Sequence, residues 1–587
     1  MHSDTVRDRI RGIVASVLDL EVDHVPADAD FDESLDADSL ERVEIAVRIE
    51  REFELTLAPE EAVAVRTVED AVALLRDRGV GTEPVDLVDR LVGRQLAAGH
   101  ADRVAVVDPD AGPVTYAALA RAAGAYAAAL RRDGVAPGTR GLIVADDSVA
   151  TVVAVLGLWW HGCVPVPLSP ALTEPEIVFV AGDCGAGFVH LDAPAAKQAA
   201  LARALGSLPG RTGEEVRATL GAQTPADVAA PAVWSAGAEA LVQYTSGSTG
   251  TPKGVRHAAT GIEAVLDGFG RVLALLPDDT VLSTAKMSFG YGFGNSVLFP
   301  LAAAARAVLL RGSVDPYAVT AAVRRHRVTV LCSVPRMYVA LLGVTGGERA
   351  SAFASLRLAL SAGEQCPADL AERVQASLGV PLVNGLGATE VLHIGVATPP
   401  AAVVPGSTGI PVPGLTVTVR DEDGAAVPDG TEGRLHLAGP AVALGYLGRP
   451  GETARTFTVG GVFTGDIVRR TADGQLWHLC RTDDLLNLGG YKVAPGEIEA
   501  VVRTAGGVAD CVVVGGIDEH GLEQAVVYAV PLPGADRAEV RRAIAGAVRR
   551  DLARFKRPAR VEVVDALPVT STGKVARYRL RDSAVRR

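Results

Sequence analysis

A short polar segment that follows an apolar stretch restricts most strongly how this chain can fold. In LVQYTSGSTGTPKGVRH, the apolar start predicts a β-strand over Leu241–Tyr244. Three glycines, three threonines and two serines follow within ten residues. Glycines let backbone N–H groups converge on an anion, and the hydroxyls and a lysine add further donors. We therefore predict a phosphate-binding loop. Its predicted contacts are Thr245, Ser246, Gly247, Ser248, Thr249, Gly250 and Lys253.

The alternative interpretation of this segment is a flexible Gly/Ser linker. A strand before it and a lysine at its end argue against a linker. The pattern also differs from the Walker A loop, which ends in Gly-Lys-Ser/Thr before a helix. Lysine is rare here, with six lysines against 51 arginines, and a compact ammonium suits a tight phosphate site. Codon bias is the other explanation for this rarity, and it accounts poorly for Lys253 and Lys574.

Charge divides the 587 residues unevenly. Residues 1–80 hold 21 acidic residues and nine arginines, a formal charge of −12, whereas the whole chain carries −13. We predict a small acidic module, with helices over residues 4–18, 39–54 and 67–78, joined to a nearly neutral large one. An acidic module repels nucleic acid and anionic membranes, so we expect it to dock on basic patches of protein partners.

The segment LDADSLERVEIAVRIEREFEL suggests what the acidic module does. Ser39 stands at the start of a predicted helix, where a serine is ordinarily an N-cap. The segment, however, resembles the second helix of acyl carrier proteins along its full length. The resemblance implies a four-helix carrier bundle over residues 1–80, with 4′-phosphopantetheine on Ser39, supplied by a phosphopantetheinyl transferase. Asp36 departs from the family, which commonly has glycine there.

The rest of the chain resembles the adenylate-forming superfamily, which includes acyl-CoA synthetases and peptide-synthetase adenylation domains. After the phosphate loop, NGLGATE, FTGDIVRR, CRTDDLLNLGGYKVAPGEIE and LPVTSTGKVARYRLR follow in the family's order. The resemblance implies that Thr389 meets the α-phosphate and Glu390 holds Mg²⁺. It also implies that Asp466 and Arg481 bind the ribose of ATP. Taken singly, Asp466 reads as a turn residue and Glu390 as a solvated acid.

The same resemblance implies an α/β enzyme with a large N-terminal subdomain over residues 85–482 and a small mobile one over residues 483–587. Residues 81–84 form the linker from the carrier, and Asp483 is the expected hinge. Lys574 would contact the carboxylate and the phosphate during adenylation and leave when the small subdomain turns. Asn487 stands where many members have lysine, which puts any role of that lysine in doubt.

The segment KMSFGYGFGNSVLFPL interleaves small residues with rings, which could form a flat slot or ordinary core packing around a Gly-rich bend. Together with NGLGATEVLHIG it resembles the benzoate-CoA ligase branch, so an aromatic carboxylic acid is the expected substrate. The candidates for lining its pocket are Gly290, Tyr291, Gly363 and His393. His393 could equally be a buried histidine with both nitrogens satisfied.

Other classes of protein are disfavoured. No stretch has the roughly 18 apolar residues of a membrane span, and the first residues lack the apolar core of a secretory signal. Six scattered cysteines indicate reduced thiols rather than a disulfide framework or a zinc site, so we expect a cytoplasmic protein.

The simplest interpretation is an ATP-dependent aryl acid–carrier ligase that hands its acyl group to a downstream enzyme. Two alternatives stay open. In one, the chain is a free aryl-CoA ligase with a separate carrier module. In the other, it uses its acyl-adenylate without forming a thioester. The linker GVGTEP spans at most on the order of 20 Å, so loading within one chain and loading between copies are both possible. The ring substituents of the acid and the oligomeric state are not encoded in these motifs.

Overall fold

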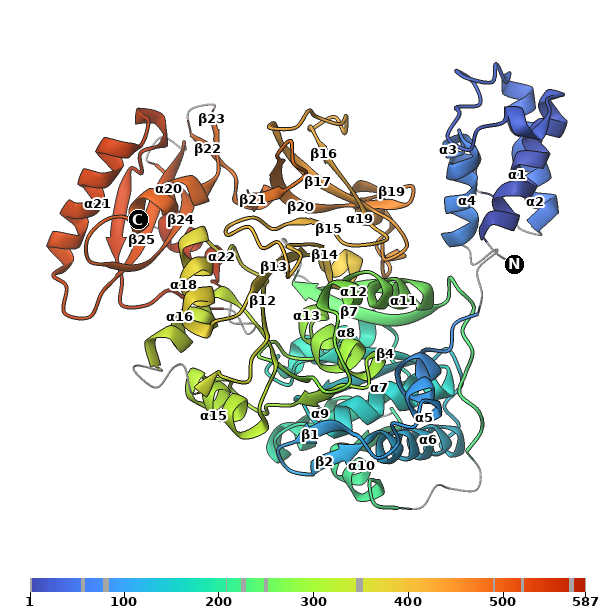
Figure 1. The fold of residues 1–587 in the computed structure, drawn as a ribbon, viewed down its shortest axis with the longest axis horizontal. Coiled ribbons are helices and arrows are strands. Elements are labelled where there is room, and N and C mark those ends of the chain that lie inside the picture. The colour runs from blue at the N-terminus through green and yellow to red at the C-terminus, as the bar shows by residue number, and fades with distance from the viewer. Residues whose placement is uncertain are drawn as a thin grey trace.

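The computed structural model describes most of the chain, in a helical N-terminal region, a large α/β region and a small C-terminal region (Figure 1). The described residues are 3–53, 57, 59–77, 84–206, 208–222, 228–246, 252–344, 352–488, 491–518, 522–569 and 575–585. Within these ranges, no helix combines the length and the apolar character needed to span a bilayer. The predicted phosphate-loop residues Gly247–Gly250 and the predicted catalytic Lys574 lie outside the described residues.

The N-terminal region is helical, and the predicted helices are confirmed to within one residue at each end. Its helices are α1 (Ser3–Leu18), η1 (Val22–His24), α2 (Ser39–Phe53), α3 (Pro59–Ala64) and α4 (Val68–Asp77). Ile10, Phe31, Ile49 and Leu75 are at most 1% exposed and form the centre of its core. The short α3, which begins at Pro59, was not predicted.

Apolar side chains form two stripes along α2 that have different environments. One stripe contains Leu40, Val43 and Val47, and the other contains Ile45, Ile49 and Phe53. Ile45 and Ile49 are each 1% exposed and pack into the core. Leu40 and Val43 are 73% and 59% exposed, although they belong to an equally regular stripe. Helical spacing alone does not distinguish a stripe that faces the core from one that faces solvent. The apolar row that follows Ser39 is therefore a surface feature of this region.

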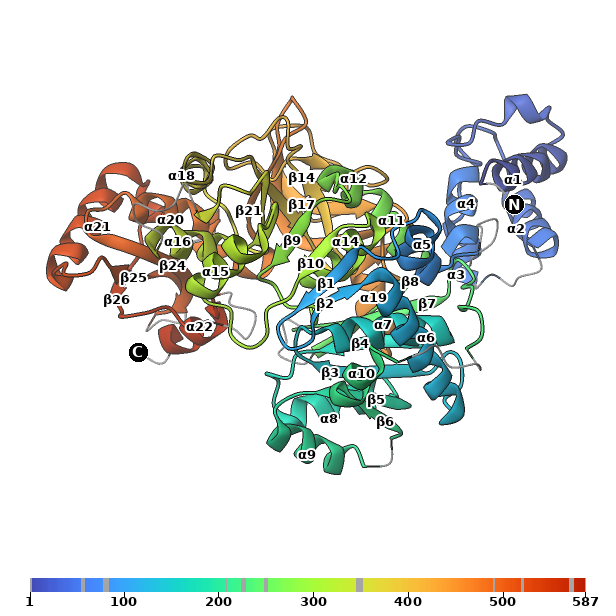
Figure 2. The same cartoon turned by 60° about the horizontal axis from the view of Figure 1, so that its bottom comes forward.

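One sheet of the large region is parallel, with the strand order β4-β3-β5-β6. Every residue of β4 and β5 is buried, as expected for a parallel sheet covered by helices (Figure 2). Its strands are β3 (Arg140–Ala145), β4 (Val164–Leu168), β5 (Phe188–Asp192) and β6 (Gly210–Thr212). The neighbouring helices are η2 (Asp89–Gly93), α5 (Arg94–Ala97), α6 (Tyr116–Arg132), α7 (Val149–His161), α8 (Glu174–Asp183), α9 (Ala195–Ala204) and α10 (Gly213–Thr219).

Helix α7 shows how local sequence sets an element's limits. The side chain of Ser148 accepts a hydrogen bond from the amide of Thr151 and so caps the start of the helix. Gly162 follows its end with φ +80°, the left-handed conformation that terminates helices. The helix is almost wholly apolar and buried, so both caps are needed to keep its ends inside the protein.

The second sheet of the large region has nine strands among the described residues, in the order β15-β14-β13-β12-β11-β9-β10-β1-β2. Its central strands run parallel, and antiparallel strands close both edges. The strands are β1 (Val104–Asp108), β2 (Gly112–Thr115), β9 (Thr280–Ser283), β10 (Arg306–Val308), β11 (Val330–Ser333), β12 (Leu358–Ala362), β13 (Leu382–Gly387), β14 (Ile394–Ala397) and β15 (Ile410–Pro411).

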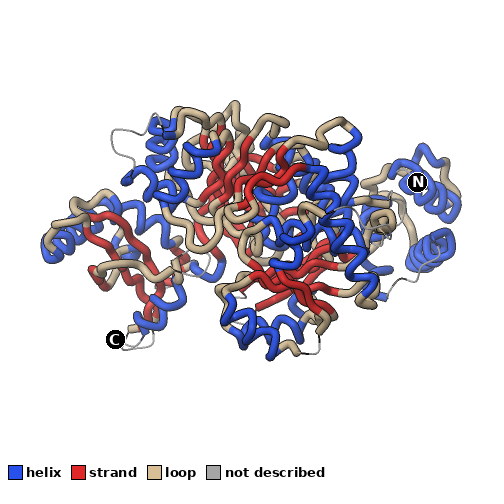
Figure 3. The backbone as a smooth tube through the Cα atoms, turned by 90° about the horizontal axis from the view of Figure 1, so that it is seen from below, coloured by secondary structure: helices blue, strands red, loops and turns tan. Residues whose placement is uncertain are grey.

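Helices and short helical turns connect these strands and cover the outside of the strand layers (Figure 3). They are α11 (Ala259–Asp267), α12 (Phe269–Leu273), α13 (Gly290–Phe293), η3 (Gly294–Leu298), α14 (Phe299–Ala302), α15 (Pro316–His326), α16 (Pro335–Val344), α18 (Ala368–Leu378) and η5 (Thr389–Val391). Ligands of open α/β sheets bind at the carboxyl ends of parallel strands. Thr389, two residues beyond the end of β13, lies at such a position.

Two smaller sheets complete the large region. Strands β7 (Glu239–Ser246), β8 (Pro252–Ala258) and β18 (Gly445–Tyr446) form one of them. The other contains β16 (Thr416–Arg420), β17 (Glu432–Ala438), β19 (Phe457–Thr458), β20 (Gly461–Arg470) and β21 (Leu476–Arg481), with α19 (Pro450–Thr456) beside it. The segment predicted as the phosphate loop thus joins two antiparallel strands, β7 and β8.

After β21 the chain passes through η6 (Thr482–Asp484) into the small region (Figure 1). There a three-stranded sheet, β24-β25-β26, packs against helices, and β22 and β23 form a hairpin. The elements are β22 (Leu486–Leu488), β23 (Tyr491–Val493), α20 (Pro495–Arg503), β24 (Val508–Ile517), β25 (Glu523–Pro531), α21 (Arg537–Asp551), η7 (Arg554–Lys556), β26 (Arg560–Val563) and α22 (Arg577–Val585).

Candidate active site

The two ends of the predicted phosphate loop lie directly opposite each other. In the β7–β8 pair Thr245 faces Lys253, so their side chains share one face of the sheet. Lys253 forms an ion pair with Glu452 and stands 5.4 Å above the ring of Tyr446. Its side chain is only 15% exposed. A half-buried cation at the mouth of the loop suits an anionic ligand.

Tyr446 connects Lys253 to the predicted metal ligand. Its hydroxyl donates a hydrogen bond of 2.6 Å to Oε1 of Glu390, and the amide of Ala443 donates to the Glu390 carbonyl. Burial raises the pKa of Tyr446, and the negative charge of Glu390 adds to that effect. One tyrosine ring therefore fixes the relative positions of a cation and a carboxylate that are 137 residues apart in sequence. Tyr446 and Glu452 were not among the predicted site residues, because Tyr446 reaches this site through the β8–β18 pairing and Glu452 through α19, which follows β18.

Asp466 and Arg481 are paired across strands β20 and β21. Nη1 of Arg481 donates to Oδ1 of Asp466 at 3.2 Å, and Nε2 of His478 lies at the same distance from that oxygen. Burial alone would raise the pKa of Asp466, but the bond to His478 and the charge of Arg481 outweigh it and lower the pKa to about 2. Asp466 is therefore a buried, ionised carboxylate near neutral pH.

The second carboxylate oxygen of Asp466, Oδ2, is free to accept a hydrogen bond from a ligand. Oδ2 is buried and has no hydrogen-bond partner among the described residues. A buried charged acceptor without a donor is costly, so the site fits a ligand that brings a hydroxyl group. The ribose of a nucleotide supplies two adjacent hydroxyls. The other ligand groups also fit: carboxylate oxygens such as those of Glu390 are the donors that Mg²⁺ prefers.

The charge of Glu390 also acts on Arg481, so the Asp466–Arg481 pair interacts electrostatically with the cluster around Tyr446. Burial would lower the pKa of Arg481, but the carboxylates of Asp466, Glu390 and Asp483 outweigh it and raise the pKa. The structure thus brings Lys253, Glu390, Asp466 and Arg481 into one contiguous charged cluster, and Thr389 precedes Glu390 in η5.

The expected hinge lies at the boundary between the large and small regions. Asp483 is exposed within η6, directly after Arg481 and Thr482. Its neighbour Asp484 forms an ion pair with Arg581, and Arg577 stands 3.8 Å away. Because both arginines belong to α22, the helix after the segment that contains Lys574 is tied to the hinge.

Three of the four candidate acyl-pocket residues lie together. The ring of His393 is 5.5 Å from that of Tyr291, and its Nε2 lies 3.3 Å from the Tyr291 carbonyl. A Cβ added at Gly290 would overlap the Leu392 carbonyl, so only glycine fits there. Gly363 is different: it is exposed at the turn after β12, with φ +88°.

His393 is buried among rings but only half satisfied. It is 3% exposed, with Phe269 and Phe299 centred 5.1 and 4.8 Å from its ring. Burial lowers the pKa of His393 to about 3, so the imidazole is neutral at pH 7. Nδ1 has no partner among the described residues. Within the described part of the chain, one ring nitrogen of His393 is thus paired and the other is not, and its place in the acyl pocket stays a prediction.

The carrier segment corrects the capping interpretation of Ser39. Asp38, not Ser39, is the N-cap of α2: its Oδ1 accepts from the amides of Leu40 and Glu41 at 2.8 Å each. The Glu41 side chain accepts in return from the Asp38 amide, which completes a capping box. Ser39 is exposed, so its hydroxyl is available for modification.

The backbone conformation at Asp36 explains why carriers commonly have glycine at this position. Its φ is +53°, in the left-handed region that glycine adopts without strain and aspartate tolerates. The departure from the family pattern therefore keeps the local backbone and leaves Ser39 in place.

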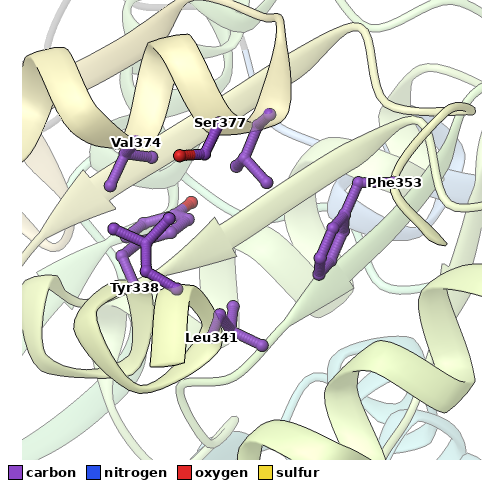
Figure 4. Close-up of a pocket in the computed structure, with 7 residues that line it drawn as sticks. Tyr338, Leu341, Phe353, Val374 and Ser377 are labelled. Carbon is purple, nitrogen blue, oxygen red and sulfur yellow. The ribbon is translucent and has the colours of Figure 1, made fainter. Parts of the chain in front are cut away.

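A separate small apolar pocket lies between α16 and α18 (Figure 4). Tyr338, whose hydroxyl donates to the carbonyls of Leu331 and Leu360, forms one side of it. The lining residues are Tyr338, Leu341, Leu342, Phe353, Val374, Ser377 and Leu378. None of them is charged or was predicted to bind a ligand, and four are buried members of the core cluster that includes residues of the central strands β9–β13.

The six cysteines are free and buried, as predicted. The described residues contain no cluster of histidine, cysteine and carboxylate side chains that could hold a metal without an added ligand.

Comparison with known families accounts for all three regions. Residues 94–447 match the AMP-binding enzyme family, residues 497–574 its C-terminal domain, and residues 8–75 the phosphopantetheine attachment site.

Individual relatives agree with this assignment. A benzoate–CoA ligase from Thauera aromatica is 33% identical over 513 residues, which cover 85% of this chain and 96% of that protein. A 3-hydroxybenzoate–CoA ligase from Aromatoleum sp. (strain CIB) is also 33% identical and is covered to 97%, again with 85% of this chain. The crystal structure of a benzoate CoA ligase from Burkholderia xenovorans LB400 superposes with a TM-score of 0.77 at 32% identity, over 85% of this chain and all of that one.

Proposed function

Because the chain belongs to the AMP-binding enzyme family and is an AMP-forming acid–thiol ligase, we propose that it activates an aromatic carboxylic acid and loads it onto its own carrier. Enzymes of this family use ATP and Mg²⁺, and an attachment domain of this kind holds 4′-phosphopantetheine. The observation that carries the proposal is the presence of both parts in one chain: a charged cluster suited to ATP, and an exposed Ser39 in the first turn of a helix capped by Asp38.

The proposed function also implies how the chain is divided into domains. We propose a four-helix carrier over residues 1–80, a linker over 81–84, a large subdomain over 85–482 and a small mobile subdomain over 483–587. The relatives named above act on benzoate and 3-hydroxybenzoate, which supports an aryl acid as the substrate. We expect the protein to work in the cytoplasm, where ATP is supplied and its six thiols stay reduced.

In the first half-reaction the aryl carboxylate attacks the α-phosphate of ATP and pyrophosphate leaves. Lys253 and Lys574 offset the repulsion between these two anions. Asp466 accepts a hydrogen bond from a ribose hydroxyl through Oδ2, and Arg481 keeps it ionised. Glu390, oriented by Tyr446, would hold Mg²⁺, which when bound neutralises phosphate charge.

In the second half-reaction the small subdomain turns about Asp483 and carries Lys574 away from the nucleotide. The acyl group then passes to the thiol on Ser39 with release of AMP. A phosphopantetheinyl transferase must modify Ser39 beforehand, and a downstream enzyme must accept the acyl group.

Intact-mass analysis tests the whole proposal. The protein is first modified by a phosphopantetheinyl transferase and then given ATP and a panel of aryl acids. We expect an acyl mass on the wild-type chain and none on Ser39→Ala. Acyl-CoA formed from added CoA without acylated protein would support a free aryl-CoA ligase instead. Pyrophosphate exchange without either product would indicate that the adenylate is used without a thioester.

Lys574→Ala separates the two half-reactions. We expect this variant to lose ATP–pyrophosphate exchange by at least about 100-fold, because it removes a charge used only in adenylation. Thioester formation from supplied acyl-adenylate should continue. Normal exchange by the variant would refute the role of Lys574.

A further inference from the structure

We propose that Gln243 determines which aryl acid is activated, by hydrogen bonding to a hydroxyl or amino substituent on the ring. This inference rests on the proposed function, since it concerns the same acyl pocket. Gln243 lies in β7 and was not among the predicted site residues. Its side chain is 1% exposed, and neither Oε1 nor Nε2 has a hydrogen-bond partner among the described residues.

The register of β7 and β8 places Gln243 on the catalytic face of the sheet. Alternate residues of a strand share a face, so Gln243 points to the same side as Thr245. Thr245 is opposite Lys253, and Gln243 is opposite Val255. Tyr244 points to the other side, where its hydroxyl donates to Asp183 at 2.6 Å. Gln243 thus lies about 7 Å along the strand from the start of the phosphate loop.

From that face the Gln243 side chain reaches the predicted acyl pocket. A Cβ added at Gly290 would lie 2.8 Å from Oε1 of Gln243 and would overlap the carbonyl of Leu392. Gly290, Gln243 and the Leu392–His393 peptide therefore meet at one point. The carboxamide therefore lies close to Gly290 and Leu392, which directly precede Tyr291 and His393, the residues expected to line the pocket for an aromatic acid.

The polar groups at this point are neutral, which selects the chemistry of the substituent. His393 is uncharged near pH 7, and its Nε2 faces a carbonyl, so that nitrogen carries the proton. Nδ1 is then a free acceptor. Gln243 adds one acceptor and one donor group. A hydroxyl or amino group can donate to either acceptor, whereas a charged substituent would find no counter-ion in this set.

The competing role for Gln243 is contact with the reacting carboxylate, which all aryl acids share. The two roles predict different results. A contact with the carboxylate would affect every acid alike, whereas a contact with a ring substituent would affect only acids that carry it.

ATP–pyrophosphate exchange by the full-length protein distinguishes them. The acids are benzoate, 3-hydroxybenzoate, 4-hydroxybenzoate and 2-aminobenzoate, and the variant is Gln243→Met, which keeps side-chain length but removes both polar atoms. We expect the wild type to prefer its best substituted acid over benzoate by about tenfold or more in kcat/KM. The variant should lose that preference through a higher KM for the substituted acid, with benzoate unchanged or improved.

Two further variants separate specificity from stability. Gln243→Asn keeps a shorter carboxamide and should restore part of the preference. His190→Leu removes another buried, partly unpaired polar side chain in a different sheet, so it should lower the melting temperature without changing the ratio.

Two results would overturn the inference and leave the proposed function standing. In one, Gln243→Met keeps the wild-type ratio of kcat/KM for the substituted acid to kcat/KM for benzoate. In the other, the variant loses kcat/KM equally for all four acids. A wild type that prefers benzoate would likewise overturn only the inference. If none of the four aryl acids supports ATP–pyrophosphate exchange, the proposed function is overturned, and the inference falls with it.

Discussion

At the scale of single residues, the site depends on side chains that hold other side chains in place. Tyr446 contacts both Lys253 and Glu390, and His478 and Arg481 keep Asp466 ionised. The sequence motifs name Lys253, Glu390 and Asp466 but not the tyrosine that orients two of them. Short motifs record the groups that meet the ligand, whereas their supports come from distant strands.

Tyr446→Phe tests that support. The variant keeps the ring beneath Lys253 but removes the hydrogen bond to Glu390. A hydrogen bond to a charged group contributes about 1.5–3 kcal/mol, so we expect a roughly tenfold or greater fall in the exchange rate and a higher Mg²⁺ requirement. ATP–pyrophosphate exchange over a Mg²⁺ titration measures both. Tyr317→Phe, at a position 70% exposed, is the control. An unchanged Mg²⁺ dependence would contradict the role of Tyr446.

Asp147 makes stability depend on pH. It is 4% exposed, and its Oδ1 accepts from the Met287 amide. Burial raises the pKa of Asp147 to about 7, although Lys286 opposes the shift. In the unfolded chain the pKa is about 3.9. The folded form therefore binds the proton more tightly, and stability from this group is complete below about pH 4 and falls as pH rises to 7.

Asp147→Asn removes this dependence. We expect the free energy of unfolding of the variant, relative to wild type, to rise by up to about 1.4 kcal/mol per pH unit between pH 5 and 7. Urea unfolding followed by tryptophan fluorescence measures it. Asp369→Asn, at a side chain 73% exposed, should show no such trend. A difference that is constant across this range would show that Asp147 titrates normally.

At the scale of elements, α22 is the structural support for the segment that contains Lys574. Arg577 donates to Oε1 of the buried Glu499 in α20 at 2.8 Å and to the Val513 carbonyl in β24 at 2.7 Å. It also lies beside Asp484, next to the hinge. The helix begins three residues beyond Lys574 and therefore links the core of the small region to the proposed hinge at Asp483.

Arg577→Met should loosen that link. It leaves Glu499, 2% exposed, with Arg503 as its remaining ion-pair partner, and breaking a buried pair costs about 3–5 kcal/mol. We expect faster hydrogen exchange in α22 and a loss of adenylation larger than the loss of thioester formation. Arg579→Met, exposed on the same helix, is the matched control. Equal losses in both half-reactions would argue that the helix does not position Lys574.

At the scale of the whole molecule, the open question is how the carrier reaches the enzyme. The short linker raises the effective concentration of Ser39 near its own active site to the order of millimolar, provided the geometry allows contact. We therefore expect loading within one chain to exceed loading between chains at micromolar protein.

Mixing two inactive variants measures the difference. Ser39→Ala retains adenylation but has no attachment site, and Lys574→Ala retains the carrier but should not adenylate. We expect acylation of the Lys574→Ala chain in the mixture to be at least about tenfold slower than self-loading by wild type and to fall on dilution. Intact mass resolves the two chains. A mixture as fast as wild type would show that loading occurs between copies.

The sequence by itself determined the order of the regions and the helices of the acidic module, and it supplied the charged residues of the proposed nucleotide site. These features are local: helical spacing, a Gly-rich loop and short motifs are written in neighbouring residues. Only the tertiary structure decided that Asp38 caps the helix at Ser39, that the Leu40 stripe faces solvent, and that Tyr446 and Gln243 lie beside predicted site residues. Each of these depends on which surfaces meet after distant strands pair, and burial and unsatisfied hydrogen bonds exist only once that packing is formed.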